Sequence, residues 1–332
     1  MLRSSALAVA LVVIVTTVAG CADASAARGV AVEAYVEPGA PTAVARVRAA
    51  TERADTIGID GVTLTADGRG LAPLPDGVDR LARAAARGGA RPELLVSNFS
   101  ETLGDFSPET ASALLADPVA RERVARELAA LAHDHHCTGV QIDLESLRDR
   151  DRAGLVAFAA ALEDAVHDEL GADAPVSMAV MASTSAAGFR DTGYDLRRLA
   201  EHVDRFVLMT YDQHGPWSGP GTIGALPWAQ RVVEVAEHEG LPADRTDLGV
   251  AGYGYRWGGP DAGQVSPARA RALAGGAARW SDRTGEWSAT LRDGHELHWS
   301  DARSYRARVA LARRLGLHGV ALWSLTTEAL PR

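Results

Sequence analysis

The chain has 332 residues, of which 47% are hydrophobic and 23% are charged, so it can bury one large core. Its net charge of -9, without a basic stripe, argues against nucleic acid as a partner. All 34 residues of the Lys and Arg class are arginines, which excludes Schiff-base catalysis, a lysine-bound pyridoxal cofactor and a Walker-type phosphate loop. We therefore expect no cofactor.

Residues 1–20 are predicted to be a lipoprotein signal peptide. Arg3 precedes the apolar run Ala6–Val15, which has the length of a signal sequence rather than of a membrane span. The run leads to Val18-Ala-Gly-Cys21, which resembles a lipobox, where the cysteine is acylated after cleavage. The alternative is an ordinary secretory signal with a chance cysteine. Residues 21–29 would be a tether, and a lipid at Cys21 would hold the exported protein on the outer face of the cell membrane.

Only one other cysteine, Cys137, would remain in the mature chain. No intramolecular disulfide is then available, although the protein is predicted to be exported. We expect Cys137 to be a buried, inert thiol.

Short apolar runs alternate with longer amphipathic ones over residues 30–328. The predicted strands are Gly29–Val36, Thr56–Thr65, Glu93–Ser97, Thr138–Glu145, Val176–Met181, Arg205–Tyr211, Asp247–Gly252 and Gly319–Ser324. The predicted helices are Thr42–Arg53, Val78–Arg87, Pro108–His133, Arg150–Leu170, Asp195–His202, Trp228–Glu239 and Asp301–Leu315. Strands separated by helices predict parallel pairing with right-handed crossovers, which eight units most economically close into an α/β (β/α)8 TIM barrel.

Residues 255–299 break this rhythm and are predicted to be a small α+β insertion between strand 7 and helix 7. They contain Trp280, Trp287 and Trp299, which either form the core of the insertion or line an extended cleft. After Ser324 only eight residues remain, so the eighth helix is expected to be missing or vestigial.

The segment Gly139-Val-Gln-Ile-Asp-Leu-Glu145 is the most informative of the chain. Because side chains alternate along a strand, Gln141, Asp143 and Glu145 share one face, and apolar residues occupy the other. Two acids in line on an otherwise apolar strand are costly to bury, which indicates a catalytic role rather than a structural one.

Polar and aromatic residues also follow the other predicted strands, where the catalytic residues of a barrel lie. They are Tyr35, Asn98, Tyr211, Asp212, Tyr253, Tyr255 and Trp323. Acids among aromatic rings suit a carbohydrate. No histidine flanks the acids at metal-ligand spacing, so no metal site is expected. His133, Asp134, His135 and His136 lie at the C-terminal end of a predicted helix on the opposite face, where a solvated role is favoured over zinc.

Three segments carry a resemblance to a known family. Thr138-Gly-Val-Gln-Ile-Asp-Leu-Glu145 resembles the signature of glycoside hydrolase family 18, and Met209-Thr-Tyr-Asp212 resembles its sixth-strand motif. Trp323 stands where that family keeps a tryptophan under the cleaved sugar. Further stretches, Ser97–Ser100, Tyr211–His214 and Trp299–Arg303 among them, are similar to the bacterial branch of spore-cortex and peptidoglycan N-acetylglucosaminidases.

The resemblance implies a retaining, substrate-assisted glycosidase acting on β-1,4-linked N-acetylglucosamine glycans. Glu145 would be the general acid and base, Asp143 would orient the sugar's acetamido group, and Tyr211 would hydrogen-bond to it. The expected substrate-binding residues are Asp212, Trp323, Gln141, Asn98, Tyr35 and Tyr253. Repulsion from Asp143 and partial burial should raise the pKa of Glu145. The expected partner is an N-acetylglucosamine-containing polysaccharide or oligosaccharide, bound by a monomer.

The sequence departs from the family signature at two positions. Thr138 and Gln141 stand where the family has aspartates. Neutral Gln141 cannot take up a proton from Asp143, but it can still hydrogen-bond to it. One alternative stays open, a catalytically silent, lectin-like barrel, although the intact Glu145 argues against it. Asp212 could also merely bond a neighbouring loop. The choices between chitin and peptidoglycan, and between endo and exo cleavage, stay open as well.

Overall fold

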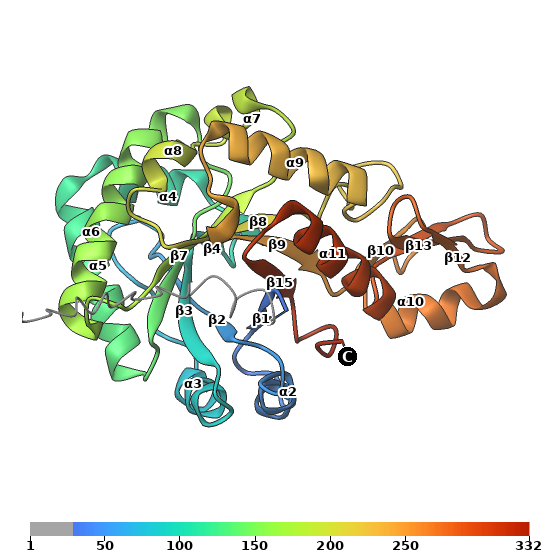
Figure 1. The fold of residues 1–332 in the computed structure, drawn as a ribbon, viewed down its shortest axis with the longest axis horizontal. Coiled ribbons are helices and arrows are strands. Elements are labelled where there is room, and N and C mark those ends of the chain that lie inside the picture. Colours follow the sequence, from blue (N-terminus) through green and yellow to red (C-terminus); the bar gives the residue numbers. More distant parts are fainter. Residues whose placement is uncertain (1–28, 332) are drawn as a thin grey trace, which may run out of the picture.

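The computed structural model describes residues 29–331, in which eight parallel strands close into a barrel (Figure 1). Around the barrel the strands follow the order β1-β15-β9-β8-β7-β6-β3-β2. They are β1 (Ala31–Val36), β2 (Thr56–Thr63), β3 (Arg91–Ser97), β6 (Gly139–Asp143), β7 (Val176–Met181), β8 (Arg205–Met209), β9 (Thr246–Ala251) and β15 (Gly319–Trp323). The predicted TIM barrel is confirmed. The predicted signal peptide and Cys21 lie outside the described residues.

Helices cover the outside of the barrel. They are α2 (Ala43–Ala50), α3 (Val78–Arg87), α4 (Pro108–Ala116), α5 (Pro118–Asp134), α6 (Arg152–Leu170), α7 (Ala186–Asp191), α8 (Leu196–Leu199), α9 (Leu226–Glu239) and α11 (Ala302–Leu315). The single helix predicted over Pro108–His133 was wrong. Pro118 cannot donate to the preceding turn, and the Asp117 side chain caps a new helix by accepting from the amides of Val119 and Ala120.

Residues 324–331, which follow β15, contain no helix or strand. Leu325 and Leu330 from this segment pack into the main core instead. Within residues 29–331 we find no helix that combines the length and the apolar character needed to cross a lipid bilayer.

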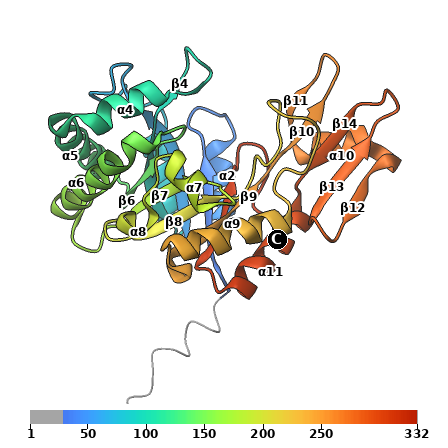
Figure 2. The ribbon, with the colours of Figure 1, turned by 90° about the horizontal axis from the view of Figure 1, so that it is seen from above.

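An insertion between β9 and α11 stands beside the barrel (Figure 2). It comprises the five-stranded sheet β11-β10-β14-β13-β12 and helix α10 (Pro267–Ala274). The strands are β10 (Gly254–Trp257), β11 (Gly263–Val265), β12 (Arg279–Ser281), β13 (Glu286–Thr290) and β14 (Glu296–Trp299). Trp299 is fully buried in a second core, Trp287 stacks on it with ring centroids 6.0 Å apart, and Trp280 contacts Trp287. The tryptophans therefore build the insertion itself.

The lower half of the barrel interior holds a buried charge layer, formed by Glu33, Glu93, Arg205 and Asp247. The Arg205 guanidinium lies 2.5 Å from Glu33, 2.6 Å from Glu93 and 3.1 Å from Asp247. Three carboxyl groups thus share one buried cation, and burial raises the pKa of Glu33 to about 7. This charge layer lies beneath the candidate site.

Candidate active site

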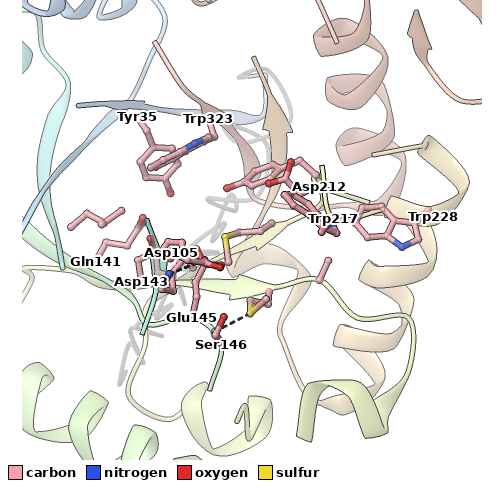
Figure 3. Close-up of a pocket in the computed structure, with 17 residues that line it drawn as sticks. Tyr35, Asp105, Gln141, Asp143, Glu145, Ser146, Asp212, Trp217, Trp228 and Trp323 are labelled. Atoms are coloured by element: carbon pink, nitrogen blue, oxygen red, sulfur yellow. Dashed lines mark hydrogen bonds between the residues drawn. The ribbon is translucent and has the colours of Figure 1, made fainter. Parts of the chain in front are cut away.

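A cavity of about 480 Å3 opens at the carboxyl ends of the barrel strands (Figure 3). It brings together seven of the residues predicted from sequence: Tyr35, Gln141, Asp143, Glu145, Tyr211, Asp212 and Trp323. These residues come from four different strands and the loops that follow them, although up to about 290 residues separate them along the chain. The parallel barrel places them at one mouth because all its strands point the same way.

Strand β6 and the two residues after it present the acid row, because the strand ends at Asp143 and not at Glu145 as predicted. Val140, Ile142 and Leu144 are buried in the outer core, while Gln141, Asp143 and Glu145 line the cavity. Burial, followed by the charge of Asp60, raises the pKa of Asp143 to about 8. Burial and the neighbouring Asp143, Asp212, Asp105 and Asp60 raise the pKa of Glu145 well above its usual range, which confirms the predicted direction. The site therefore favours the protonated form of both carboxyl groups.

Asn98 does not line the cavity, contrary to its predicted contact with substrate. Its Oδ1 accepts a hydrogen bond from the Glu145 amide at 2.8 Å, and its Nδ2 donates to the Glu145 carbonyl at 2.9 Å. Nδ2 also donates to the Ser107 carbonyl at 2.9 Å. Asn98 thus fixes the main chain of Glu145, and its own side chain is 1% exposed.

Gln141 does not use its capacity to hydrogen-bond to Asp143 but bonds toward the charge layer instead. Its Nε2 donates to Ser177 Oγ at 2.9 Å and to Glu33 Oε1 at 3.4 Å, and Ser177 in turn donates to Glu93 at 2.6 Å. Within the described residues, Gln141 Oε1, Asp143 Oδ1 and the Tyr35 hydroxyl are buried without a hydrogen-bond partner. Buried polar atoms are normally paired, so these three are suited to a polar ligand.

Tyr211 and Asp212 follow β8 and face the same cavity. Burial and the nearby Asp143 and Glu145 raise the pKa of Tyr211, so its hydroxyl remains a donor. Asp212 has a left-handed backbone, with φ of 58°, and its Oδ1 accepts from the hydroxyls of Tyr253 at 2.7 Å and Tyr255 at 3.1 Å. Tyr253 does not line the cavity but lies beneath Asp212, so it supports this acid instead of forming part of the cavity wall.

The aromatic floor of the cavity is formed by Trp323 and Tyr35. Their ring centroids lie 5.2 Å apart at an interplanar angle of 53°. Trp323 ends β15, and both residues belong to one buried cluster that closes the centre of the barrel. The flat face of the Trp323 ring, which lines the cavity, can hold the face of a sugar ring.

Several lining residues were not predicted. Asp105 and Phe106 come from the short hairpin of β4 (Phe99–Ser100) and β5 (Asp105–Phe106), and Trp217 and Trp228 come from the region that follows β8. Trp217 is 65% exposed at the rim, and the centroid of its ring lies 5.9 Å from that of Tyr255. The exposed aromatics and the turn-forming residues around them were visible in the sequence, but their orientation depends on tertiary packing.

Among residues 29–331 no group of three or more His, Cys, Asp or Glu side chains is arranged to hold a metal ion. The histidines before β6 form surface pairs instead. His135 lies 3.0 Å from Asp79, and His133 lies 3.3 Å from Asp134.

The sequence profile of glycosyl hydrolases family 18 matches residues 101–328, more than half of the chain. The chain belongs to glycosyl hydrolase family 18. The resemblance seen in the sequence is thereby confirmed, and the match includes the acid row, Tyr211, Asp212 and Trp323.

The proteins similar to this chain include cortex-lytic enzymes and a chitinase. The cortical fragment-lytic enzyme of Bacillus subtilis is 30% identical over 233 residues, covering 66% of this chain and 54% of the relative. The spore cortex-lytic enzyme SleL of Bacillus cereus superposes with a TM-score of 0.79 at 23% identity, covering 90% of this chain and 72% of SleL. A family 18 chitinase of Cycas revoluta in complex with (GlcNAc)3 gives a TM-score of 0.78 at 18% identity, covering 90% and 96%. The chain spans about half the length of the curated relatives that it matches.

Proposed function

We propose that the protein is a retaining, substrate-assisted glycosidase that cleaves β-1,4-linked N-acetylglucosamine glycans. One observation carries the proposal: Asp143, Glu145 and Tyr211 line a single cavity above an aromatic floor in a chain of family 18. Burial raises the pKa of both Asp143 and Glu145, which favours a proton-donating role for Glu145.

In this mechanism Glu145 donates its proton to the glycosidic oxygen as the bond from that oxygen to the anomeric carbon breaks. The acetamido oxygen of the same sugar attacks the anomeric carbon and forms a cyclic, positively charged intermediate. Water then attacks the anomeric carbon, Glu145 takes up its proton, and the ring of the intermediate opens. The acid returns to its starting state, and the configuration at the anomeric carbon is retained.

The acetamido group must be held in place for this attack. Asp143, whose Oδ1 is unpaired within the described residues, would accept from the acetamido N–H and stabilise the positive charge. The Tyr211 hydroxyl would donate to the acetamido oxygen. Trp323 would support the sugar from below, and Trp217 at the rim would stack on a neighbouring unit of the glycan.

For the substrate we favour peptidoglycan-type glycans or their fragments, because the relatives include cortex-lytic enzymes. The complex of the Cycas chitinase with (GlcNAc)3 keeps chitin oligosaccharides as a further candidate. An exported protein held on the outer face of the membrane through Cys21 would lie next to peptidoglycan. This anchor remains a prediction from the sequence.

The test compares wild type with Glu145→Gln on peptidoglycan, glycan strands and chitin oligosaccharides, with new reducing ends as the readout. Since general acid–base catalysis contributes about 10²- to 10⁴-fold, kcat should fall by at least about 100-fold. Glu234→Gln, an exposed substitution on α9, is the matched control and should retain full activity.

The alternative is a silent, lectin-like barrel, which the neutral Gln141 in the acid row favours. Equal glycan binding by wild type and Glu145→Gln, with no product from either, would establish it and refute the glycosidase.

A further inference from the structure

The segment between β8 and α9, residues 211–225, is called here the Tyr211 loop. It carries Tyr211, Asp212 and Trp217 into the cavity, yet it contains no helix or strand. No helix or strand hydrogen bonds fix its shape. Contacts with other residues must therefore hold it in place.

The two ends of the Tyr211 loop are tied to each other. The Gln213 amide donates to the Ile223 carbonyl at 2.8 Å. The Gln213 side-chain oxygen accepts from the Thr222 hydroxyl at 2.8 Å and from the Ala225 amide at 3.0 Å. The catalytic end of the loop thus follows the position of residues 222–225.

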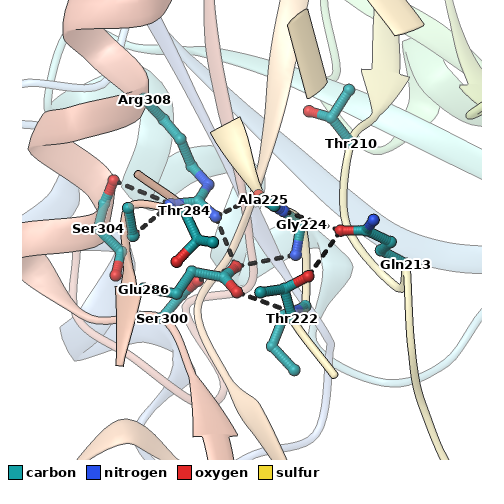
Figure 4. Close-up of polar contacts among 12 residues, drawn as sticks. Thr210, Gln213, Thr222, Gly224, Ala225, Thr284, Glu286, Ser300, Ser304 and Arg308 are labelled. Atoms are coloured by element: carbon teal, nitrogen blue, oxygen red, sulfur yellow. Dashed lines mark hydrogen bonds and ion pairs between the residues drawn. The ribbon is translucent and has the colours of Figure 1, made fainter. Parts of the chain in front are cut away.

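A carboxylate from the insertion holds those residues. Glu286, at the start of β13, accepts from the Ile223 amide at 2.9 Å and from the Gly224 amide at 2.8 Å (Figure 4). Its side chain is 1% exposed, so both bonds form away from water, where they are strongest. No apolar side chain could replace an acceptor for two buried amides.

Arg308 completes this arrangement from α11, a helix of the barrel. Its guanidinium lies 2.6 Å from Glu286 and donates to the carbonyls of Gly224 at 2.5 Å, Gly285 at 3.0 Å and Ser304 at 3.2 Å. Gly224 is therefore held through its amide by Glu286 and through its carbonyl by Arg308. The buried charges compensate each other, as a stable internal ion pair requires.

Gly224 transmits this position to the catalytic residue. A Cβ at Gly224 would lie 2.2 Å from the Thr210 carbonyl oxygen and 3.3 Å from the Tyr211 Cα, so the two backbones are already in close contact. Any shift of Gly224 toward β8 must displace Thr210 and Tyr211. The path from the ion pair to the Tyr211 main chain is thus two contacts long.

We propose that Glu286 and Arg308 are positioning residues for catalysis, which place the Tyr211 hydroxyl at the reacting sugar through Gly224. The inference rests on the proposed function, because Tyr211 is taken to hold the acetamido group. It also assigns the insertion a role in catalysis, since the insertion supplies one half of the pair.

Three variants separate positioning from fold stability. Glu286→Gln keeps the size of the side chain but offers one acceptor oxygen in place of two, so either the Ile223 or the Gly224 amide loses its acceptor. Glu286→Met combined with Arg308→Met removes both charges, so it avoids the unpaired ion, yet it still deprives both amides of their acceptor. Leu128→Ala opens a cavity in α5, far from the Tyr211 loop in the sequence and fully buried, and serves as the control for global destabilisation.

All rates are measured well below each variant's unfolding midpoint, on one glycan that the wild type cleaves. We expect kcat to fall about 10- to 100-fold in both Glu286 variants, because a displacement of about 1 Å near the reaction is enough for such a loss. Leu128→Ala should keep its kcat despite a lower midpoint. The pH profile of the remaining activity should keep its shape, since Asp143 and Glu145 are untouched.

Amide hydrogen exchange tests the contact between Glu286 and the Tyr211 loop without an activity measurement. The Ile223, Gly224 and Gln213 amides should exchange faster in both Glu286 variants than in Leu128→Ala. If wild type cleaves no glycan, the proposed function fails, while faster exchange would still establish the clamp on the loop. Unchanged kcat in either Glu286 variant, or exchange equal to that of the control, would overturn the positioning role.

Discussion

Asn98 holds Glu145 by both polar groups of its main chain, at 2.8 Å from the amide and 2.9 Å from the carbonyl. Strand β6 ends at Asp143, so the strand ladder no longer fixes Glu145, the proposed general acid. The orientation of Glu145 is instead set by an amide at the end of β3, the neighbouring strand.

Replacing Asn98 with alanine should therefore affect the rate more than substrate binding. Loss of its buried hydrogen bonds should lower the free energy of unfolding by about 1–3 kcal/mol. Displacement of Glu145 should lower kcat by about 10- to 100-fold with little change in KM. Urea unfolding and steady-state kinetics measure the two effects. A variant that loses stability but keeps kcat would show that Glu145 needs no such support.

Asp60 raises the pKa of Asp143 through its charge, in addition to the larger effect of burial. In Asp60→Asn one negative neighbour is removed, so ionisation of Asp143 becomes easier and its pKa falls. Asp60 also acts on Glu145, so both limbs of the kcat/KM profile should move to lower pH. A pH series on a chromogenic oligosaccharide checks this shift. Asp76→Asn, an exposed change in the loop before α3, should leave the profile where it is.

Glu33 links stability to pH because its pKa is raised from 4.5 to about 7 in the folded protein. Between these values the folded state binds more protons than the unfolded state, so stability falls as pH rises through this window. The cost at higher pH is on the order of 3 kcal/mol.

Glu33→Gln removes this titration and keeps the size of the side chain. The variant should match wild type near about pH 5, where Glu33 is protonated, and should be the more stable protein near about pH 8. Thermal unfolding at both pH values measures the difference. Parallel dependence on pH in the two proteins would exclude Glu33 as its source.

Trp217 offers an exposed ring at the rim of the cavity, 65% accessible to solvent. If a glycan unit stacks on it, Trp217→Ala should weaken binding of long substrates by about 1–2 kcal/mol, which is roughly a 5- to 30-fold higher KM. Substrates too short to reach the rim should be unaffected. KM is therefore compared over a series of oligosaccharides of increasing length. An equal rise in KM at all lengths would contradict a role in stacking.

The barrel and its acid row could be predicted because both depend on local patterns. Period-two alternation placed Gln141, Asp143 and Glu145 on one face, and the topology of parallel strands then gathered Tyr211 and Trp323 at the same mouth. The direction of the Glu145 pKa shift followed from two neighbouring acids in a buried place.

What could not be predicted depends on partners that are distant in the chain. Asn98 and Tyr253 follow strands just as Tyr211 does, but packing turns them toward Glu145 and Asp212 instead of the cavity. Gln141 bonds to Ser177, which lies next to the charge layer, and this partner is better placed than Asp143. Nothing in the sequence around Gln141 specifies that layer, which is assembled from β1, β3, β8 and β9.

The pairing of Glu286 with Arg308 bears on attempts to engineer this protein. Glu286 belongs to the insertion and Arg308 belongs to the barrel helix α11. Removal of residues 254–299 would therefore leave the Arg308 cation buried without its partner. A chimera that exchanges the insertion for one from another enzyme must also carry Arg308 and the glycine at position 224. We therefore expect the insertion and the barrel to fold as one unit, because the Glu286–Arg308 pair joins them in the interior.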